Sequence, residues 1–161
     1  MEEYSKNLKF KHKKDLLHFD EGRLDLRLRV LVHATAEYTS DLRRSDHSLP
    51  VLVVTDTLRT PKDMLGIYGD IYRKQGIPES GIAEEVAKRK SPHLENRAVD
   101  FRAQDWTPET MGKIKDFIET HFRHYGVAVL IHDTGKDLTN GKISTGIHYH
   151  VSLKPIQKGL K

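Results

Sequence analysis

Two short patterns in the sequence contain residues that can bind a metal and transfer a proton. His93 and Asp100 form a His-x6-Asp pattern, and His148 and His150 form a His-x-His pair. A catalytic zinc ion takes three nitrogen or oxygen ligands from the protein and keeps a fourth position for water. Two of these imidazoles and the carboxylate would complete such a ligand set and leave one histidine for acid–base chemistry. Together the two patterns predict a metallohydrolase.

Strand geometry gives a reason for these side chains to meet. We expect strands over residues 97–102 and 146–153, and side chains on a strand point alternately to its two faces. Asp100 then shares a face with Ala98, and both members of the His-x-His pair share a face of the second strand. If the two strands are neighbours, a carboxylate and two imidazoles form one patch, over which His93 can fold from the preceding loop. A His-x-His pair alone is a weak indication, and its combination with His-x6-Asp is more specific.

The sequence contains ten histidines, and position separates the others from this group. Those in the basic N-terminal segment, on the first expected helix and in the last turn of a later helix have ordinary structural uses, such as packing or interaction with a helix dipole. Two more, in a loop and at a strand end, could border a cleft without binding the metal. The first set is His12, His18, His33, His121 and His124, and the second is His47 and His132.

The remaining expected elements must position this patch. Threonine–proline pairs at residues 60–61 and 107–108 each supply a helix N-cap followed by proline at the first helical position. An apolar stripe follows the second pair until Gly126, and the β-branched run at 51–54 indicates a buried strand. The expected helices span residues 22–38, 61–74, 82–89 and 108 to Gly126, the further strands span 51–56 and 127–131, and a turn-rich loop spans 134–141.

Helices in the first half and short strands in the second predict an α+β fold. We expect a small, mainly antiparallel four-stranded sheet packed with helices. The 161 residues fit a single domain, which we place at residues 21–161, after a basic N-terminal leader at residues 1–20. No cysteine is present, which excludes disulfides but leaves a metal site of nitrogen and oxygen ligands open.

Basic residues concentrate in the leader. The formal net charge is +4, and five lysines lie between residues 6 and 14. Such a run is usually solvated surface, so we expect no specific nucleic-acid partner. Charges interrupt residues 1–20 throughout, and no apolar run approaches the ~18 residues of a membrane span. We therefore expect a soluble protein, cytoplasmic at synthesis, with no cleaved export signal and no membrane insertion.

The patterns together resemble a known superfamily. The motif S-x-H-x3-R-A-x-D at residues 91–100, followed by H-x-H at residues 148–150, resembles the zinc peptidase superfamily of D-alanyl-D-alanine carboxypeptidases, phage L-alanyl-D-glutamate endolysins, murein endopeptidases and the hedgehog signalling domain. The resemblance covers roughly residues 51–153, because residues 57–60 are also similar to a family segment that carries an arginine before its next helix. It implies a fold of the hedgehog and D-Ala-D-Ala-peptidase type.

The resemblance implies that one zinc ion per chain is bound by His93, Asp100 and His150. It makes His148 the member of the His-x-His pair that lies beside the metal without binding it. Zinc lowers the pKa of a bound water from about 15.7 towards about 7, which produces a nucleophile for an amide carbonyl. His148 would then assist by orienting or deprotonating that water and by stabilising the oxyanion.

Two further residues acquire roles from the resemblance. It implies that Arg59 binds the substrate, because a guanidinium suits bidentate recognition of a carboxylate or carbonyl, and that Ser91 lines the site. From the residues alone, Arg59 could equally form a surface salt bridge. For the hydroxyl of Ser91, a hydrogen bond to nearby backbone in a turn is the commoner use. Asn96 stands where the family commonly has glycine, and asparagine tolerates the left-handed backbone that such a turn needs.

Many carboxypeptidase and endolysin members place an acidic residue shortly before the final ligand, whereas residues 144–147 contain none. Two functions therefore stay open. The favoured one is hydrolysis of a peptide bond in D-residue-containing cell-wall peptides by a phage-type lysin or a carboxypeptidase, with a cytoplasmic dipeptidase as another enzymatic option. A phage-encoded lysin would reach the peptidoglycan by a route other than a signal peptide. The alternative is a non-catalytic, zinc-dependent binding module of the same fold.

Overall fold

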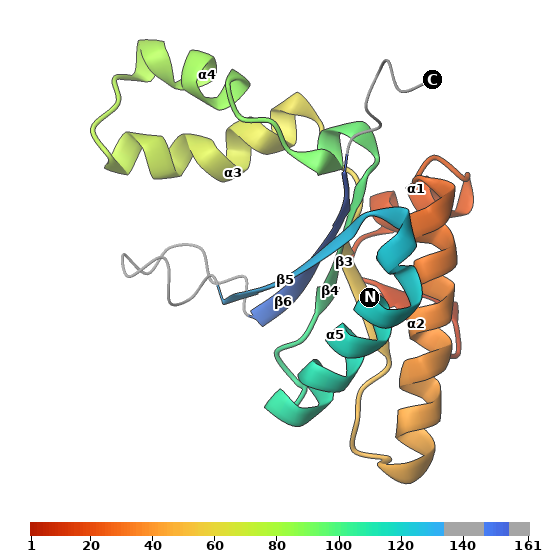
Figure 1. Cartoon of the computed structure of the whole chain (residues 1–161). Coiled ribbons are helices and arrows are strands. Elements are labelled where there is room, and N and C mark those ends of the chain that lie inside the picture. The colour runs from red at the N-terminus through yellow and green to blue at the C-terminus, as the bar shows by residue number, and fades with distance from the viewer. Residues whose placement is uncertain (134–146, 155–161) are drawn as a thin grey trace.

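The centre of the fold is a mixed six-stranded sheet in this computed structural model, which describes residues 1–133 and 147–154 (Figure 1). The strands are β1 (Glu2–Ser5), β2 (Leu8–Phe10), β3 (Leu52–Asp56), β4 (Ala98–Arg102), β5 (Val127–Asp133) and β6 (Ile147–Leu153). Their spatial order is β1-β2-β3-β4-β6-β5. The β2 and β3 strands run parallel, and every other neighbouring pair is antiparallel.

Five α-helices accompany the sheet in the described part of the chain. They are α1 (Lys13–Asp20), α2 (Leu26–Ser45), α3 (Pro61–Lys74), α4 (Glu79–Ala87) and α5 (Pro108–Phe122), with short 3₁₀ turns η1 (Pro92–Glu95) and η2 (Arg123–Tyr125). None of these helices is long and apolar enough to cross a membrane.

The expected α+β class is confirmed, but the sheet has six strands where four were expected, and it is mixed because β2 and β3 pair in parallel. The two additional strands, β1 and β2, come from the lysine-rich segment near the N-terminus. Leu8 and Phe10 are buried on either side of the half-buried Lys9, so β2 alternates as a strand should. It adds to the sheet through parallel pairing of Leu8 with Leu52.

Residues 1–20, expected as a basic leader, form β1, β2 and α1. Phe10 and Phe19 are fully buried in the same apolar cluster as residues of α2 and the sheet. The helix expected over residues 22–38 is displaced towards the C-terminus, because α2 begins after Asp25, whose carboxylate accepts from the Arg27 N–H at 2.9 Å. Residues 1–20 thus pack against α2 and the sheet as part of the main apolar cluster.

The main core lies between one face of the sheet and the helices α1, α2 and α5 (Figure 1). Its central side chains are fully buried, among them Leu28 and Leu31 of α2, Ile114 of α5, Phe101 of β4 and Tyr149 of β6. The predicted start of α5 is confirmed, since the Thr107 side chain accepts from the Thr110 N–H and proline follows it. This core holds β4 and β6 in place from behind.

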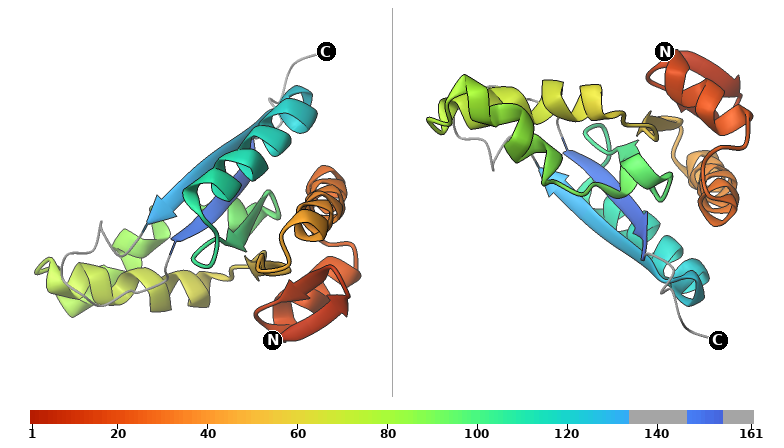
Figure 2. Two further views of the ribbon diagram at one scale, coloured as in Figure 1. Left: turned by 90° about the horizontal axis from the view of Figure 1, so that it is seen from below. Right: turned by 90° about the horizontal axis from the view of Figure 1, so that it is seen from above.

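Helices α3 and α4 form a hairpin that projects away from the helices covering the core (Figures 1 and 2). Its bounds follow local signals. Thr60 and Asp63 form a capping box at the start of α3, and the predicted range 61–74 is confirmed. The hairpin has an apolar cluster of its own, centred on Met64, Ile82 and Val86. The turn-rich loop predicted at 134–141 lies outside the described residues.

Candidate metal centre

The strands β4 and β6 are neighbours, as the predicted patch requires. Asp100 lies directly opposite His150, and Arg102 lies opposite His148. Buried and half-buried residues alternate along β6, so Tyr149 belongs to the core while both histidines lie on the other face. The carboxylate and the two imidazoles therefore share one patch of the sheet.

His93 reaches this patch from the turn η1, just before β4. The Ser91 hydroxyl caps the turn by accepting from the His93 backbone N–H at 3.3 Å, and Pro92 follows at its first position. Asn96 ends the turn with φ 60° and ψ 27°. Among non-glycine residues this left-handed conformation is best tolerated by asparagine and aspartate, so the turn keeps its shape without the glycine common in the resembled family.

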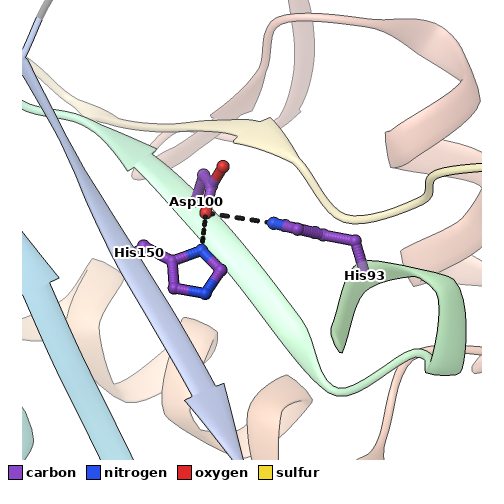
Figure 3. A group of neighbouring side chains, drawn as sticks. All are labelled: His93, Asp100 and His150. Atoms are coloured by element: carbon purple, nitrogen blue, oxygen red, sulfur yellow. Dashed lines mark hydrogen bonds and ion pairs between the residues drawn. The ribbon is translucent and has the colours of Figure 1, made fainter. Parts of the chain in front are cut away.

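The three side chains converge on a single point (Figure 3). Asp100 Oδ1 lies 3.2 Å from His93 Nε2 and 2.8 Å from His150 Nδ1. One ligand atom from each residue lies within 4.8 Å of the other two, so the group could hold a metal ion. His93 is fully buried, and its other ring nitrogen, Nδ1, has no hydrogen-bond partner among the described residues. Packing and the Asp100 contact therefore orient this ring.

Electrostatics keep Asp100 ionised. Burial alone would raise the pKa of this carboxyl, but the charge and hydrogen bonds of His93 and His150 outweigh burial and hold the pKa well below its usual range. A buried carboxylate is unfavourable unless cationic groups or hydrogen-bond donors compensate its charge. A metal ion held by the same three residues would supply the largest such charge.

Arg59 and Asp56 extend the charged group on the other side of Asp100. Arg59 Nε donates to Asp56 Oδ2 at 2.6 Å, and Arg59 Nη2 lies 3.8 Å from Asp100 Oδ2. Burial raises the pKa of the Asp56 carboxyl, even though His93 and Arg59 act to lower it. A β-bulge between Val54 and Asp56 sets Asp56 opposite Asp100. The guanidinium of Arg59 thus faces two carboxylates.

A cavity of about 880 Å³ opens in front of the group, between the sheet and helix α3. Of the six residues predicted for the site, all except His93 line it, because His93 is buried behind the others. The cavity also has an apolar wall from α3. The lining residues that sequence reasoning did not single out include Asp56, Met64, Ile67, Tyr68, Ile71 and Arg102.

His148 lies beside the metal-binding group and is not a member of it. Its Nε2 atom is 4.0 Å from Asp100 Oδ2, and its ring stacks on that of His132 with 5.5 Å between centroids. His132 lines the cavity, in agreement with the expectation that it borders a cleft. Both histidines are therefore within the cavity, next to the atoms that could hold an ion.

A buried hydrogen-bonded chain, which no local sequence pattern predicts, lies behind the site and connects its segments. His18 Nε2 donates to Asn96 Oδ1 at 2.7 Å, and His18 Nδ1 lies 3.0 Å from Thr57 Oγ1. Asp15 Oδ1 in turn accepts from the Thr57 backbone N–H at 2.9 Å and from its hydroxyl at 3.0 Å. Helix α1 is thereby connected both to the segment that carries Arg59 and to the turn between His93 and Asp100.

No protein-family model, curated protein or solved structure matches the chain. The candidate site therefore rests on the motifs and on their geometry. The metal-binding group of His93, Asp100 and His150 is present in that geometry. The roles expected for Arg59 and Ser91 stay predictions: both line the cavity, Arg59 is engaged by carboxylates, and the Ser91 hydroxyl is also used in the turn.

Proposed function

We propose that this protein is a zinc-dependent peptidase that hydrolyses a peptide bond in D-residue-containing peptides of the bacterial cell wall. One observation carries the proposal: His93, Asp100 and His150 bring their ligand atoms within 4.8 Å of one another at the edge of a cavity large enough for a short peptide. The motif resemblance supplies the substrate class, and a phage-type lysin or a carboxypeptidase fits it equally well.

The donor set and its spacing suit zinc. A tetrahedral ion with bonds of about 2.0–2.1 Å places its ligand atoms roughly 3.3 Å apart. The 3.2 Å between His93 Nε2 and Asp100 Oδ1 is close to that value, and the 2.8 Å between His150 Nδ1 and the same oxygen needs only a small outward shift. Two imidazoles and one carboxylate are also the kind of set found in catalytic zinc sites, which keep a position open to solvent.

A bound zinc ion would supply Lewis acidity, which polarises a carbonyl and makes a water a stronger acid. The chain's own residues would do the rest. His148, on the cavity side of Asp100, can accept the proton of the attacking water and donate a hydrogen bond to the carbonyl oxygen as negative charge develops there. Arg59 holds Asp100 in place through their 3.8 Å contact and, by the resemblance, also contacts the substrate.

A non-catalytic zinc-dependent binding module is the second candidate. It is favoured by the absence of an acidic residue at positions 144–147, where many catalytic relatives of the motif carry their base. The same cavity and the same metal ligands would serve such a module. The two candidates therefore differ only in whether a bound peptide is cut.

The metal site is tested by measuring metal content per chain in the purified full-length protein with inductively coupled plasma mass spectrometry. We expect about one zinc ion per chain, and its loss in His93→Ala, Asp100→Ala and His150→Ala because each change removes a ligand. His47→Ala is a matched control, since this exposed histidine lies outside the cavity. Normal zinc occupancy in all three ligand variants would refute the site.

The reaction is tested by incubating the zinc-loaded protein with purified peptidoglycan and with acyl-D-Ala-D-Ala, followed by mass spectrometry of the products. Released D-alanine indicates a carboxypeptidase, and new amino termini within the stem peptide indicate an endopeptidase. Zinc bound at one per chain with no product from either substrate would contradict the peptidase and favour the binding module.

A further inference from the structure

Three arginines line the cavity, and two of them already have partners. Arg59 contacts Asp56 and Asp100. Arg89 lies over the ring of Tyr68 at 3.9 Å and donates to the Tyr72 hydroxyl at 3.2 Å. Arg102 belongs to the ladder of β4 through its backbone, but its side chain has no hydrogen-bond or ion-pair partner in the described part of the chain.

Arg102 lies beside the candidate metal centre. It follows Asp100 by two residues on β4, so the two side chains lie on the same face of the sheet. It is also the cross-strand neighbour of His148 on β6. Paired Cβ atoms in a sheet are about 4.5–5.5 Å apart, so the guanidinium extends from a point next to the proposed proton-transfer histidine.

Arg102 is half-buried, and a half-buried cation without a counter-charge is unfavourable unless a ligand provides one. Its planar fork of N–H donors matches the two oxygens of a carboxylate. Arg59 is a weaker candidate for this task, because a third carboxylate would have to approach a guanidinium that two carboxylates already face. Among the three arginines of the cavity, Arg102 is therefore the one available for an acidic ligand group beside the metal-binding group, and the exposed Lys11 and Lys90 add positive charge to the same cavity.

We propose that Arg102 forms a carboxylate-binding subsite that positions a peptide next to His93, Asp100 and His150. The ligand class is a short peptide with a free carboxylate and an apolar portion, because Met64, Ile67 and Ile71 of α3 also line the cavity. The carboxylate is either the C-terminus of the peptide or an acidic side chain. The assignment of a peptide ligand rests on the proposed function, whereas the recognition of a carboxylate rests on Arg102 itself.

The subsite is tested by isothermal titration calorimetry on the zinc-loaded full-length protein. One pair of probes is N-acetyl-D-Ala-D-Ala and its C-terminal amide, and a second pair is N-acetyl-L-Ala-D-Glu-amide and the same peptide with D-glutamine. We expect the wild type to prefer the acid in at least one pair. Arg102→Gln should weaken binding of that acid by roughly 10- to 100-fold and leave its neutral counterpart unchanged. The pair that responds identifies the source of the carboxylate.

Controls separate recognition from structure. Arg102→Lys should recover part of the preference for the acid, because it restores the charge without the fork. Arg89→Gln is the matched control, since it removes an arginine of the same cavity that is already engaged, and it should keep the wild-type preference. Zinc stoichiometry and thermal melting of each variant report on folding.

The proposal and the peptidase assignment fail in different ways. A wild type that shows no preference for either acid, or an Arg102→Gln variant that weakens acid and amide equally, would overturn the subsite even if peptides are cut. Selective loss of acid binding in Arg102→Gln without any peptide cleavage by the wild type would support the subsite and reject the peptidase.

Discussion

Asp100 is the residue on which the candidate site depends, because its two oxygens have different neighbours. Oδ1 faces His93 and His150, and Oδ2 faces Arg59 and His148 at 3.8 and 4.0 Å. One oxygen can thus serve a metal ion while the other orients the side chains that act on a substrate. Loss of such outer contacts typically costs roughly 10- to 100-fold in metal affinity or activity.

His148→Ala separates catalysis from metal binding. We expect the variant to keep its zinc, because His148 is not a member of the group of potential ligands, and to lose roughly 10²- to 10⁴-fold in kcat, the usual contribution of a general acid or base. Metal analysis and steady-state kinetics on the same preparation provide the measurement. His132→Ala, the stacked neighbour, should lose much less.

Either of two results would contradict this role. Loss of zinc from His148→Ala would make the residue a ligand, and unchanged turnover would remove it from the reaction.

The metal-binding group could be predicted from the sequence because its spacing and strand alternation are local signals. Asp100 and His150 needed only the assumption that their two strands are neighbours. The contact between His18 and Asn96 joins residues 78 positions apart, and no local pattern in either segment marks it. The sequence also could not predict that the Arg102 side chain lacks a partner, because this depends on which carboxylates lie next to each arginine in the folded chain.

Among the elements, the α3–α4 hairpin is the one that we expect to unfold locally without the main core. Its own apolar cluster contains Ile82, which is 1 % exposed, and the cluster is separate from the main core. Ile82→Ala should destabilise the hairpin by about 2–5 kcal/mol and speed amide hydrogen exchange in α3 and α4. Exchange in α2 and β4 should stay slow, because local opening of the hairpin leaves the main core intact.

Leu28→Ala is the counterpart of Ile82→Ala in the main core, where Leu28 is fully buried. It should raise exchange throughout the sheet and α2. Equal acceleration in β4 by both variants would show that the hairpin unfolds only together with the rest of the molecule, and would contradict its independence.

Element prediction succeeded where the chain carries strong local signals. The bounds of α3 and the start of α5 follow from a threonine cap and a proline, which act within one turn. β1 and β2 were missed because both are short: β1 is mostly exposed and has no apolar alternation, and the alternation of β2 is brief and lies among lysines. Their place in the sheet depends on the parallel pairing of β2 with β3, more than forty positions away along the chain, which no local pattern specifies.

Across the whole molecule, His18 links stability to pH. Burial lowers the pKa of this imidazole below its ordinary value of 6.5, and the hydrogen bond to Asn96 only partly offsets burial. The folded state therefore binds fewer protons at His18 than the unfolded state does once the pH is below about 6.5. We expect this contribution to be complete above that pH and to be lost as the pH falls through the folded-state pKa.

The measurement is the free energy of unfolding from urea titrations at pH 5.0 and 7.5. His18→Gln should be less stable than the wild type at pH 7.5 and should lose less stability on acidification, because glutamine can donate a hydrogen bond but does not titrate. An identical pH dependence in both proteins would exclude His18 as the source.

The place of β6 between β4 and β5 also constrains the order in which the chain can assemble. β6 is the last of the described strands in the sequence, yet it occupies an inner position in the sheet. During synthesis β4 keeps an open edge and β5 has no partner until β6 emerges from the ribosome. A stalled or truncated chain would thus expose two unpaired strand edges. β6 covers both of these edges and also carries His150. The third metal-binding side chain therefore joins the site in the same step that pairs the exposed strands.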